Sequence, residues 1–208
     1  MKPNNAKTII AAIFILAGAV AACAQPTGTP GAVPLTDRQR IFSTHGFSFL
    51  PPQQSGWLEK FEKHQITFLK ETDSTTVSFY TQAIEAKFSE HEAPSTENEL
   101  VAFVRSRKDD WGPDKNLFTN QSSLIGIEES EKSCVSYRVS AHDRATKHKG
   151  DHEFLVLHTV GRFCLHPQNR TAAVDIFYSV RHIPNFDASA LFDEGESFLK
   201  SLQFETPK

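Results

Sequence analysis

Histidine is concentrated in one part of this chain: five of its nine histidines lie between residues 142 and 166. Imidazole is a common ligand of Zn²⁺ and Cu²⁺, so a metal or small-ligand site is one interpretation of this segment. In a hairpin, His142 and His158 would be diagonal neighbours about 7 to 8 Å apart at Cα, and a third ligand would come from His152 or Asp143. Because no His-x-x-x-His or Cys-x-x-Cys spacing occurs, we expect a solvated hairpin without a metal or cofactor.

Motifs of hydrolytic and nucleotide chemistry are absent from the sequence. Gly46-Phe47-Ser48 is followed by Leu50 where a Gly-x-Ser-x-Gly nucleophile turn needs glycine, and His152-Glu153 lacks the second His of a zinc-protease motif. Glycine loops for phosphates or dinucleotides are missing too. We therefore assign no catalytic residue and expect no enzymatic activity. A hydrolase stays open only if folding joins distant Ser, His and acidic residues at a concave site.

The N-terminus has the parts of a secretory signal. Two lysines, Lys2 and Lys7, precede an apolar stretch that ends in Val20-Ala21-Ala22-Cys23. This ending resembles the bacterial lipobox, which implies a signal peptide over 1–22, cleavage before Cys23 and a lipid on the Cys23 sulfur. Ala24 in place of Asp resembles sorting to the outer membrane, facing the periplasm. The alternative is an incidental cysteine beside an ordinary cleavage site.

The charge balance narrows the kinds of partner. The formal net charge is −3, and removal of the signal with its two lysines makes it −5. Basic and acidic residues are interspersed, so the basic stripe typical of nucleic-acid binding is missing and we expect no nucleic-acid partner. An acidic chain is also repelled by anionic lipid, which leaves the lipid on Cys23 as the expected membrane contact.

If Cys23 carries lipid, Cys134 and Cys164 are the two cysteines left, and outside the cytoplasm they are expected to form a disulfide. If the two cysteines lie opposite each other in an antiparallel hairpin, the turn of that hairpin is centred near Lys149. The disulfide then lies on the more polar face of the hairpin, and the alternate residues form an apolar face. Around the following turn, the same reasoning predicts Arg162 opposite Asp175 as a structural cross-strand ion pair.

Secondary-structure patterns indicate one domain over 36–208, preceded by a flexible tether of Pro and Gly over 23–35. Alternating apolar residues and turn signals predict an α+β fold, with a single antiparallel meander sheet of about seven strands packed with two helices. Strands are predicted at 46–50, 65–70, 75–87, 117–127, 133–143, 152–166 and 171–182. Helices are predicted from Thr96 to about Asp110, and from Asp187 or Ser189 to about residue 202.

One segment points to a family. Gly46-Phe-Ser-Phe-Leu-Pro-Pro52, followed by Gly56-Trp57, resembles the opening of PsbP/Mog1-like domains, where a short Phe-rich strand runs into Pro and then Trp. The resemblance implies a compact antiparallel sheet with helices on both faces, in a family of binding and assembly modules. From the predicted anchor, tether and disulfide and the missing catalytic motifs, we expect a lipid-anchored periplasmic module that binds a protein or another envelope component, possible partners including an envelope protein.

Overall fold

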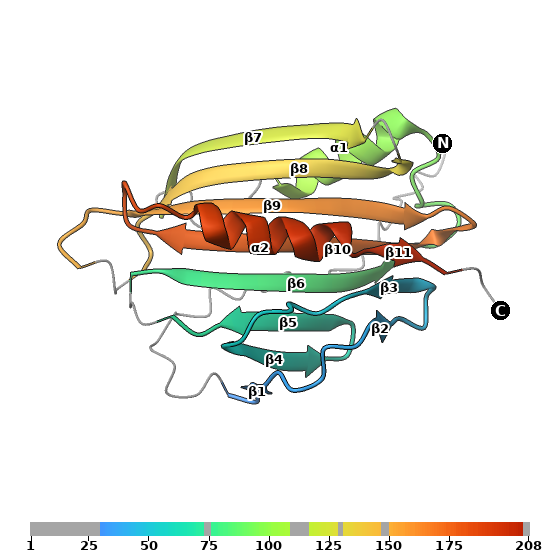
Figure 1. Ribbon diagram of the computed structural model, residues 1–208. Helices are drawn as coiled ribbons and strands as arrows, with labels where there is room; N and C mark the ends of the chain where they lie inside the picture. The colour runs from blue at the N-terminus through green and yellow to red at the C-terminus, as the bar shows by residue number, and fades with distance from the viewer. Residues whose placement is uncertain (1–29, 73–75, 109–116, 129–130, 147–149, 206–208) are drawn as a thin grey trace, which may run out of the picture.

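The computed structural model of this chain describes residues 30–72, 76–108, 117–128, 131–146 and 150–205. Its main feature is a large antiparallel sheet with the spatial order β1-β4-β5-β6-β10-β9-β8-β7 (Figure 1). The strands of this sheet are β1 (Val33–Pro34), β4 (Trp57–Glu62), β5 (Gln65–Lys70), β6 (Ser78–Lys87), β7 (Phe118–Glu128), β8 (Glu131–Asp143), β9 (Leu155–His166) and β10 (Asn169–His182). With its two helices, the sheet confirms the predicted α+β class.

A second, three-stranded sheet has the order β11-β3-β2. Its strands are β2 (Ile41–Phe42), β3 (Phe47–Phe49) and β11 (Gln203–Phe204). Phe204 lies opposite Phe47, so this sheet joins the two ends of the described chain. The sequence prediction contained β3 only, because strands of two residues carry no alternation to detect.

Both faces of the large sheet are buried, and each face has its own core. Helix α2 (Ser189–Lys200) and the small sheet cover one face, where Val174, Ile176 and Tyr178 of β10 point. Helix α1 (Glu97–Lys108) covers the other face, where Ala173 and Phe177 point. In Figure 1, α2 crosses in front of the sheet and α1 lies behind β7 and β8. The predicted single domain therefore has two hydrophobic cores, one on each face of its large sheet.

The helix starts follow the local sequence. At α1 the backbone N–H of Glu99 donates to Thr96 Oγ1 at 3.2 Å, and the Thr96 N–H donates to Glu99 Oε2 at 3.1 Å. This is the predicted capping box, which satisfies two of the free amides at the helix start. At α2 the Ser189 N–H donates to Asp187 Oδ1 at 3.0 Å. The predicted helix end at 109–113 lies outside the described residues.

A glycine brings α2 close to the sheet. A Cβ atom on Gly195 would lie 2.4 Å from the ring of Tyr178 in β10, closer than any packed carbon atoms can approach. The helix can therefore pack directly on that ring, although glycine in a helix costs about 1 kcal/mol relative to alanine. Tyr178 donates in turn to Glu196 Oε1 on the same helix at 3.2 Å.

The register of the β8–β9 hairpin is as predicted. Cys134 lies opposite Cys164, and the same register continues to Asp143 opposite Leu155. The predicted β9–β10 register is wrong by one residue: Asp175 faces Phe163 and Arg162 faces Ile176. An irregularity between Asn169 and Ala173 causes the shift, and a shift of one residue places each side chain on the opposite face. Arg162 and Asp175 therefore do not pair.

Other boundaries also differ from the sequence prediction. The sheet is not a simple meander, because β10 pairs with β6 and the chain crosses through α1 to the edge strand β7. Strand β4 was missed, and β9 begins at Leu155 instead of 152. The predicted tether ends earlier than residue 35, since Val33 and Pro34 pair with β4 and Leu35 is 6% exposed.

We predict that Gly195→Ala lowers the free energy of unfolding by about 1 to 3 kcal/mol, because the added methyl group forces Tyr178 or α2 to move. Urea unfolding followed by circular dichroism measures the change. Gly126→Ala is the matched control, since a Cβ atom there meets nothing within 4 Å. Equal stability of the two variants would contradict the close packing of α2 on Tyr178.

Candidate functional site

Two of the predicted features lie outside the described residues: the signal peptide over 1–22 and the lipid-bearing Cys23. Their assignment therefore stays a prediction. Of the helices the structure describes, neither is both long and apolar enough to cross a bilayer.

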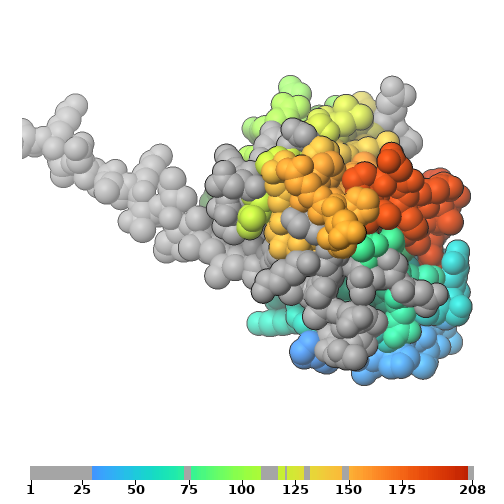
Figure 2. Space-filling view, turned by 90° about the vertical axis from the view of Figure 1, so that its left-hand side faces the viewer, coloured from blue at the N-terminus to red at the C-terminus, as the bar shows by residue number. Residues whose placement is uncertain are grey.

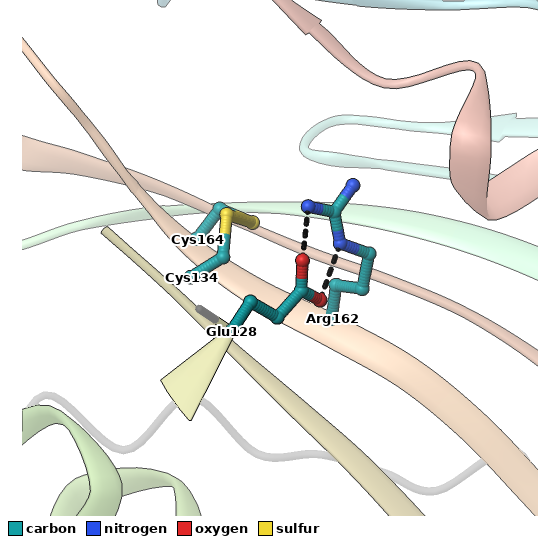
Figure 3. The surroundings of a disulfide bond; sticks show 4 residues. All are labelled: Glu128, Cys134, Arg162 and Cys164. Atoms are coloured by element: carbon teal, nitrogen blue, oxygen red, sulfur yellow. Dashed lines mark hydrogen bonds and ion pairs between the residues drawn. A yellow bond between two sulfur atoms is a disulfide. The ribbon is translucent and has the colours of Figure 1, made fainter. Parts of the chain in front are cut away.

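Cys134 and Cys164 form a disulfide, with Cα atoms 4.1 Å apart. Both residues are fully buried in the core beneath α2. Their neighbours on the same face of the hairpin, Ser136 and Arg162 among them, are polar and more exposed than the alternate residues, so the disulfide lies on the more polar face as predicted. Beside the disulfide, Arg162 donates to both carboxylate oxygens of Glu128 at 2.7 and 2.6 Å (Figure 3). The bond spans 30 residues, which in the chain-entropy model stabilises the fold by about 3 to 4 kcal/mol.

The histidines of the β8–β9 hairpin have separate surroundings. The His142 ring stacks on Phe154 with centroids 3.8 Å apart, whereas His158 Nδ1 lies 2.8 Å from Ser140 Oγ. His152 is exposed outside the strand. Asp143, the other suggested ligand, is paired with Arg181 at 2.6 Å. Figure 2 shows this end of the molecule, with the residues before β9 in orange beside α2 in red.

Three-residue metal sites are therefore not formed by these groups. Among the described residues, no cluster of three His, Cys, Asp or Glu side chains is placed to hold an ion. His158 instead has His182 as its neighbour, with ring centroids 5.5 Å apart, and Phe192 of α2 at 5.6 Å. Its surroundings are those of a side chain that packs the helix against the sheet.

One concave site does bring serine, histidine and glutamate together. A cavity of about 390 Å³ at the start of α1 is lined by Ser95, Glu97, Ser133 and His166, among others. His166 is not available as a base, because Nε2 lies 3.0 Å from the Glu205 carbonyl and Nδ1 accepts the Gln168 N–H. The geometry of a hydrolytic triad is therefore not assembled there.

The buried charges beneath α1 also satisfy one another. Asp175 accepts a hydrogen bond from Tyr137 at 2.6 Å and one from Lys108 Nζ at 2.8 Å. Burial raises the pKa of Tyr137 well above its ordinary value, and the Asp175 charge adds to the effect. Lys108 Nζ also lies over the Tyr137 ring, 4.2 Å from its centroid. All three groups are enclosed and satisfy one another's hydrogen bonds and charge.

The most distinctive open feature is an apolar groove of about 270 Å³ between the small sheet and the β4–β5 turn. Phe42 and Phe61 line it and remain 66% and 60% exposed. The other apolar lining residues are Ile41, Phe47, Phe49, Ile66, Ala83 and Val174. The volume is smaller than that of a drug-sized pocket, so the groove fits an apolar side chain or a short chain. We call it the Phe42/Phe61 groove.

Glu85 belongs to the polar rim of this groove, and its Oε2 lies within hydrogen-bonding distance of His45 Nδ1, at 2.8 Å. Sequence reasoning placed neither Phe42 nor Phe61 at a site. Phe61 belongs to β4, a strand that was not predicted, and Phe42 to a strand of two residues. The sequence did contain one signal for this site, an excess of Phe over 41–61. Residue type alone does not show whether such phenylalanines lie in the core or at the surface.

No family model matches the chain, and no curated protein matches its sequence. Among solved structures, the chain is similar to the Ran-binding protein Mog1p of Saccharomyces cerevisiae, with 10% identity over 81% of this chain and 95% of that chain and a TM-score of 0.47. It is similar to cyanobacterial PsbP from Synechocystis, with 16% identity, coverages of 86% and 99% and a TM-score of 0.43. At this level of similarity no site residue is carried over from either protein.

We predict that stability falls as the pH is lowered through the His158 titration. Burial lowers the pKa of His158 below 6.5, and His182 and Arg138 lower it further. Below pH 6.5 the unfolded chain therefore binds a proton that the folded chain does not, and the free energy of unfolding decreases until the folded pKa is reached.

Nuclear magnetic resonance titration of the His158 ring protons measures this pKa directly. Urea unfolding at several pH values should show a shallower pH dependence for His158→Gln than for the original chain. A His158 pKa above 6.5 would contradict the buried environment.

Proposed function

We propose that this protein is a binding or assembly module of the bacterial cell envelope, without catalytic activity, held at the outer membrane by a lipid on Cys23 and facing the periplasm. The observation that carries the binding role is the Phe42/Phe61 groove. Two phenylalanines with most of their surface exposed flank one apolar hollow, and such clustering is typical of interaction sites.

The anchor is supported by the lipobox resemblance and by the use of cysteine. The disulfide between Cys134 and Cys164 suits an oxidising compartment such as the periplasm. With Cys134 and Cys164 paired, Cys23 is the one cysteine of the sequence left for a lipid.

The absence of catalysis is supported by the state of the buried polar groups. Asp175 is held by Tyr137 and Lys108, and Glu194 accepts the Trp57 indole N–H at 2.7 Å. Lys70 lies 3.3 Å from the same carboxylate. Both carboxylates are also buried, at 5% and 8% exposure, so a substrate in solvent does not reach them.

The groove would contribute to binding mainly through apolar burial. Complete burial of a phenylalanine side chain is worth about 1.5 to 3 kcal/mol. Phe42 and Phe61 each have a large exposed fraction left to bury. An envelope protein that inserts an apolar side chain between them would therefore gain affinity without any change in the fold of this chain.

We predict that Cys23→Ser moves the protein from the membrane fraction to the soluble periplasmic fraction, since the acyl attachment point is lost. Fractionation and immunoblotting measure this, and Gln25→Ala serves as the neighbouring control. Continued sedimentation of Cys23→Ser with membranes would contradict the lipid anchor. It would not bear on binding at the Phe42/Phe61 groove.

The double variant Phe42→Ser/Phe61→Ser is predicted to lose its envelope partner. Both positions are exposed, so the free energy of unfolding should change by no more than about 0.5 kcal/mol per substitution. Formaldehyde cross-linking in cells, followed by mass spectrometry, identifies proteins captured by the original chain. Phe186→Ser, an exposed phenylalanine elsewhere, should retain them. Retention by the double variant as well would contradict a role of the groove.

A further inference from the structure

Glu85 ends a row of apolar side chains along the Phe42/Phe61 groove. It lies opposite Val174 of β10. Ala83, two residues earlier on β6, lies opposite Ile66 of β5. Opposite residues of antiparallel strands share a face, and so do residues two apart on one strand. These four side chains therefore lie on one face of the large sheet, where all of them line the groove.

The Glu85 carboxylate is only half engaged. His45 Nδ1, in the turn between β2 and β3, lies 2.8 Å from Glu85 Oε2. An ionised carboxylate only accepts hydrogen bonds, so the imidazole N–H donates. Among the described residues, no donor forms a hydrogen bond with Glu85 Oε1. The Glu85 side chain is 23% exposed, so one oxygen of a largely buried carboxylate is left for a donor that enters the groove.

The other charged groups that line the groove do not neutralise Glu85. Glu62 pairs with Lys60 at 2.8 Å. Lys63 and His64 are exposed on the β4–β5 turn, and neither forms an ion pair with Glu85. The chain as a whole is acidic, with a formal net charge of −3, which also favours a basic partner.

These charges discriminate between possible occupants of the groove. An acidic side chain would be repelled by Glu85. A purely hydrocarbon side chain would gain apolar burial but would displace water from Glu85 without supplying a donor, which is costly. A basic side chain supplies both the donor and the opposite charge.

The two exposed phenylalanines favour arginine among the basic side chains. Phe42 and Phe61 flank the groove with most of their surface uncovered. A guanidinium group stacks on aromatic rings and donates hydrogen bonds in its own plane, whereas a lysine ammonium is a compact, strongly hydrated charge. The apolar stem of arginine can also be buried against the rings.

We propose that the Phe42/Phe61 groove receives an arginine side chain of the protein partner. The stem lies between the two phenylalanines, and the guanidinium donates to Glu85 Oε1. This inference rests on the proposed binding role of the groove and names the side chain that the partner presents to it.

The test compares two small probes on the full-length protein, purified from a Gram-negative cell and held in lipid nanodiscs. N-acetyl-arginine N-methylamide is the basic probe, and N-acetyl-norleucine N-methylamide is its uncharged counterpart. Nuclear magnetic resonance follows the methyl signals of Ile41, Ile66 and Val174, which line the groove. The arginine probe should shift these signals with a dissociation constant about tenfold lower than that of the norleucine probe, because it adds a hydrogen bond between charged groups.

A substitution at Glu85 makes the test specific. Glu85→Gln keeps an acceptor for His45 but loses the charge, so the preference for the arginine probe should disappear. Glu90→Gln, at an exposed glutamate outside the groove, should keep it. Equal affinity for the two probes, no shift with either probe, or a preference that survives Glu85→Gln would overturn the proposal.

Failure of this inference can be told from failure of the proposed function. If Phe42→Ser/Phe61→Ser loses the cross-linked envelope proteins while Glu85→Gln retains them, the groove binds its partner by apolar contact and the arginine proposal is wrong. If the double phenylalanine variant retains them, the groove has no binding role and both proposals are wrong.

Discussion

The structure depends on the burial of strand β10 on both of its faces. Val174, Ile176, Tyr178 and Val180 pack beneath α2, and Ala173 and Phe177 pack beneath α1. Strand β10 can contribute to both cores only in one register with β9 and β6, because a slip of one residue exchanges the faces. The same register decides that Asp175 lies beneath α1 with Lys108 and Tyr137, while Arg162 lies on the α2 side with Glu128.

This arrangement leaves the margins of the fold as the place for the proposed binding. The centre of the sheet is covered on both sides, and described titratable groups within it, such as Asp175 and Asp143, are held by Tyr137 and Arg181. The space between the small sheet and the β4–β5 turn stays open and offers apolar side chains.

Much of the fold could be predicted from local signals. The capping box at Thr96 placed the start of α1, and two cysteines on neighbouring strands fixed the β8–β9 register. The β9–β10 register could not be obtained in this way, because the irregularity at Asn169 to Ala173 has no sequence signature. The two buried faces of β10 could not be told apart, since from Ala172 to Val180 only Asp175 and Ser179 interrupt an apolar run and no alternation shows. The groove was out of reach because exposed and buried phenylalanines look alike in sequence.

Double-mutant cycles test the two-faced burial of β10 most directly. The free energy of unfolding would be measured for Asp175→Asn, Lys108→Met, Arg162→Met and the two double variants with Asp175→Asn. The structure predicts a coupling of about 1 kcal/mol or more between Asp175 and Lys108, and additivity within about 0.5 kcal/mol for Asp175 and Arg162. A coupling of Asp175 to Arg162 as large as that to Lys108 would place both on one face and contradict the account.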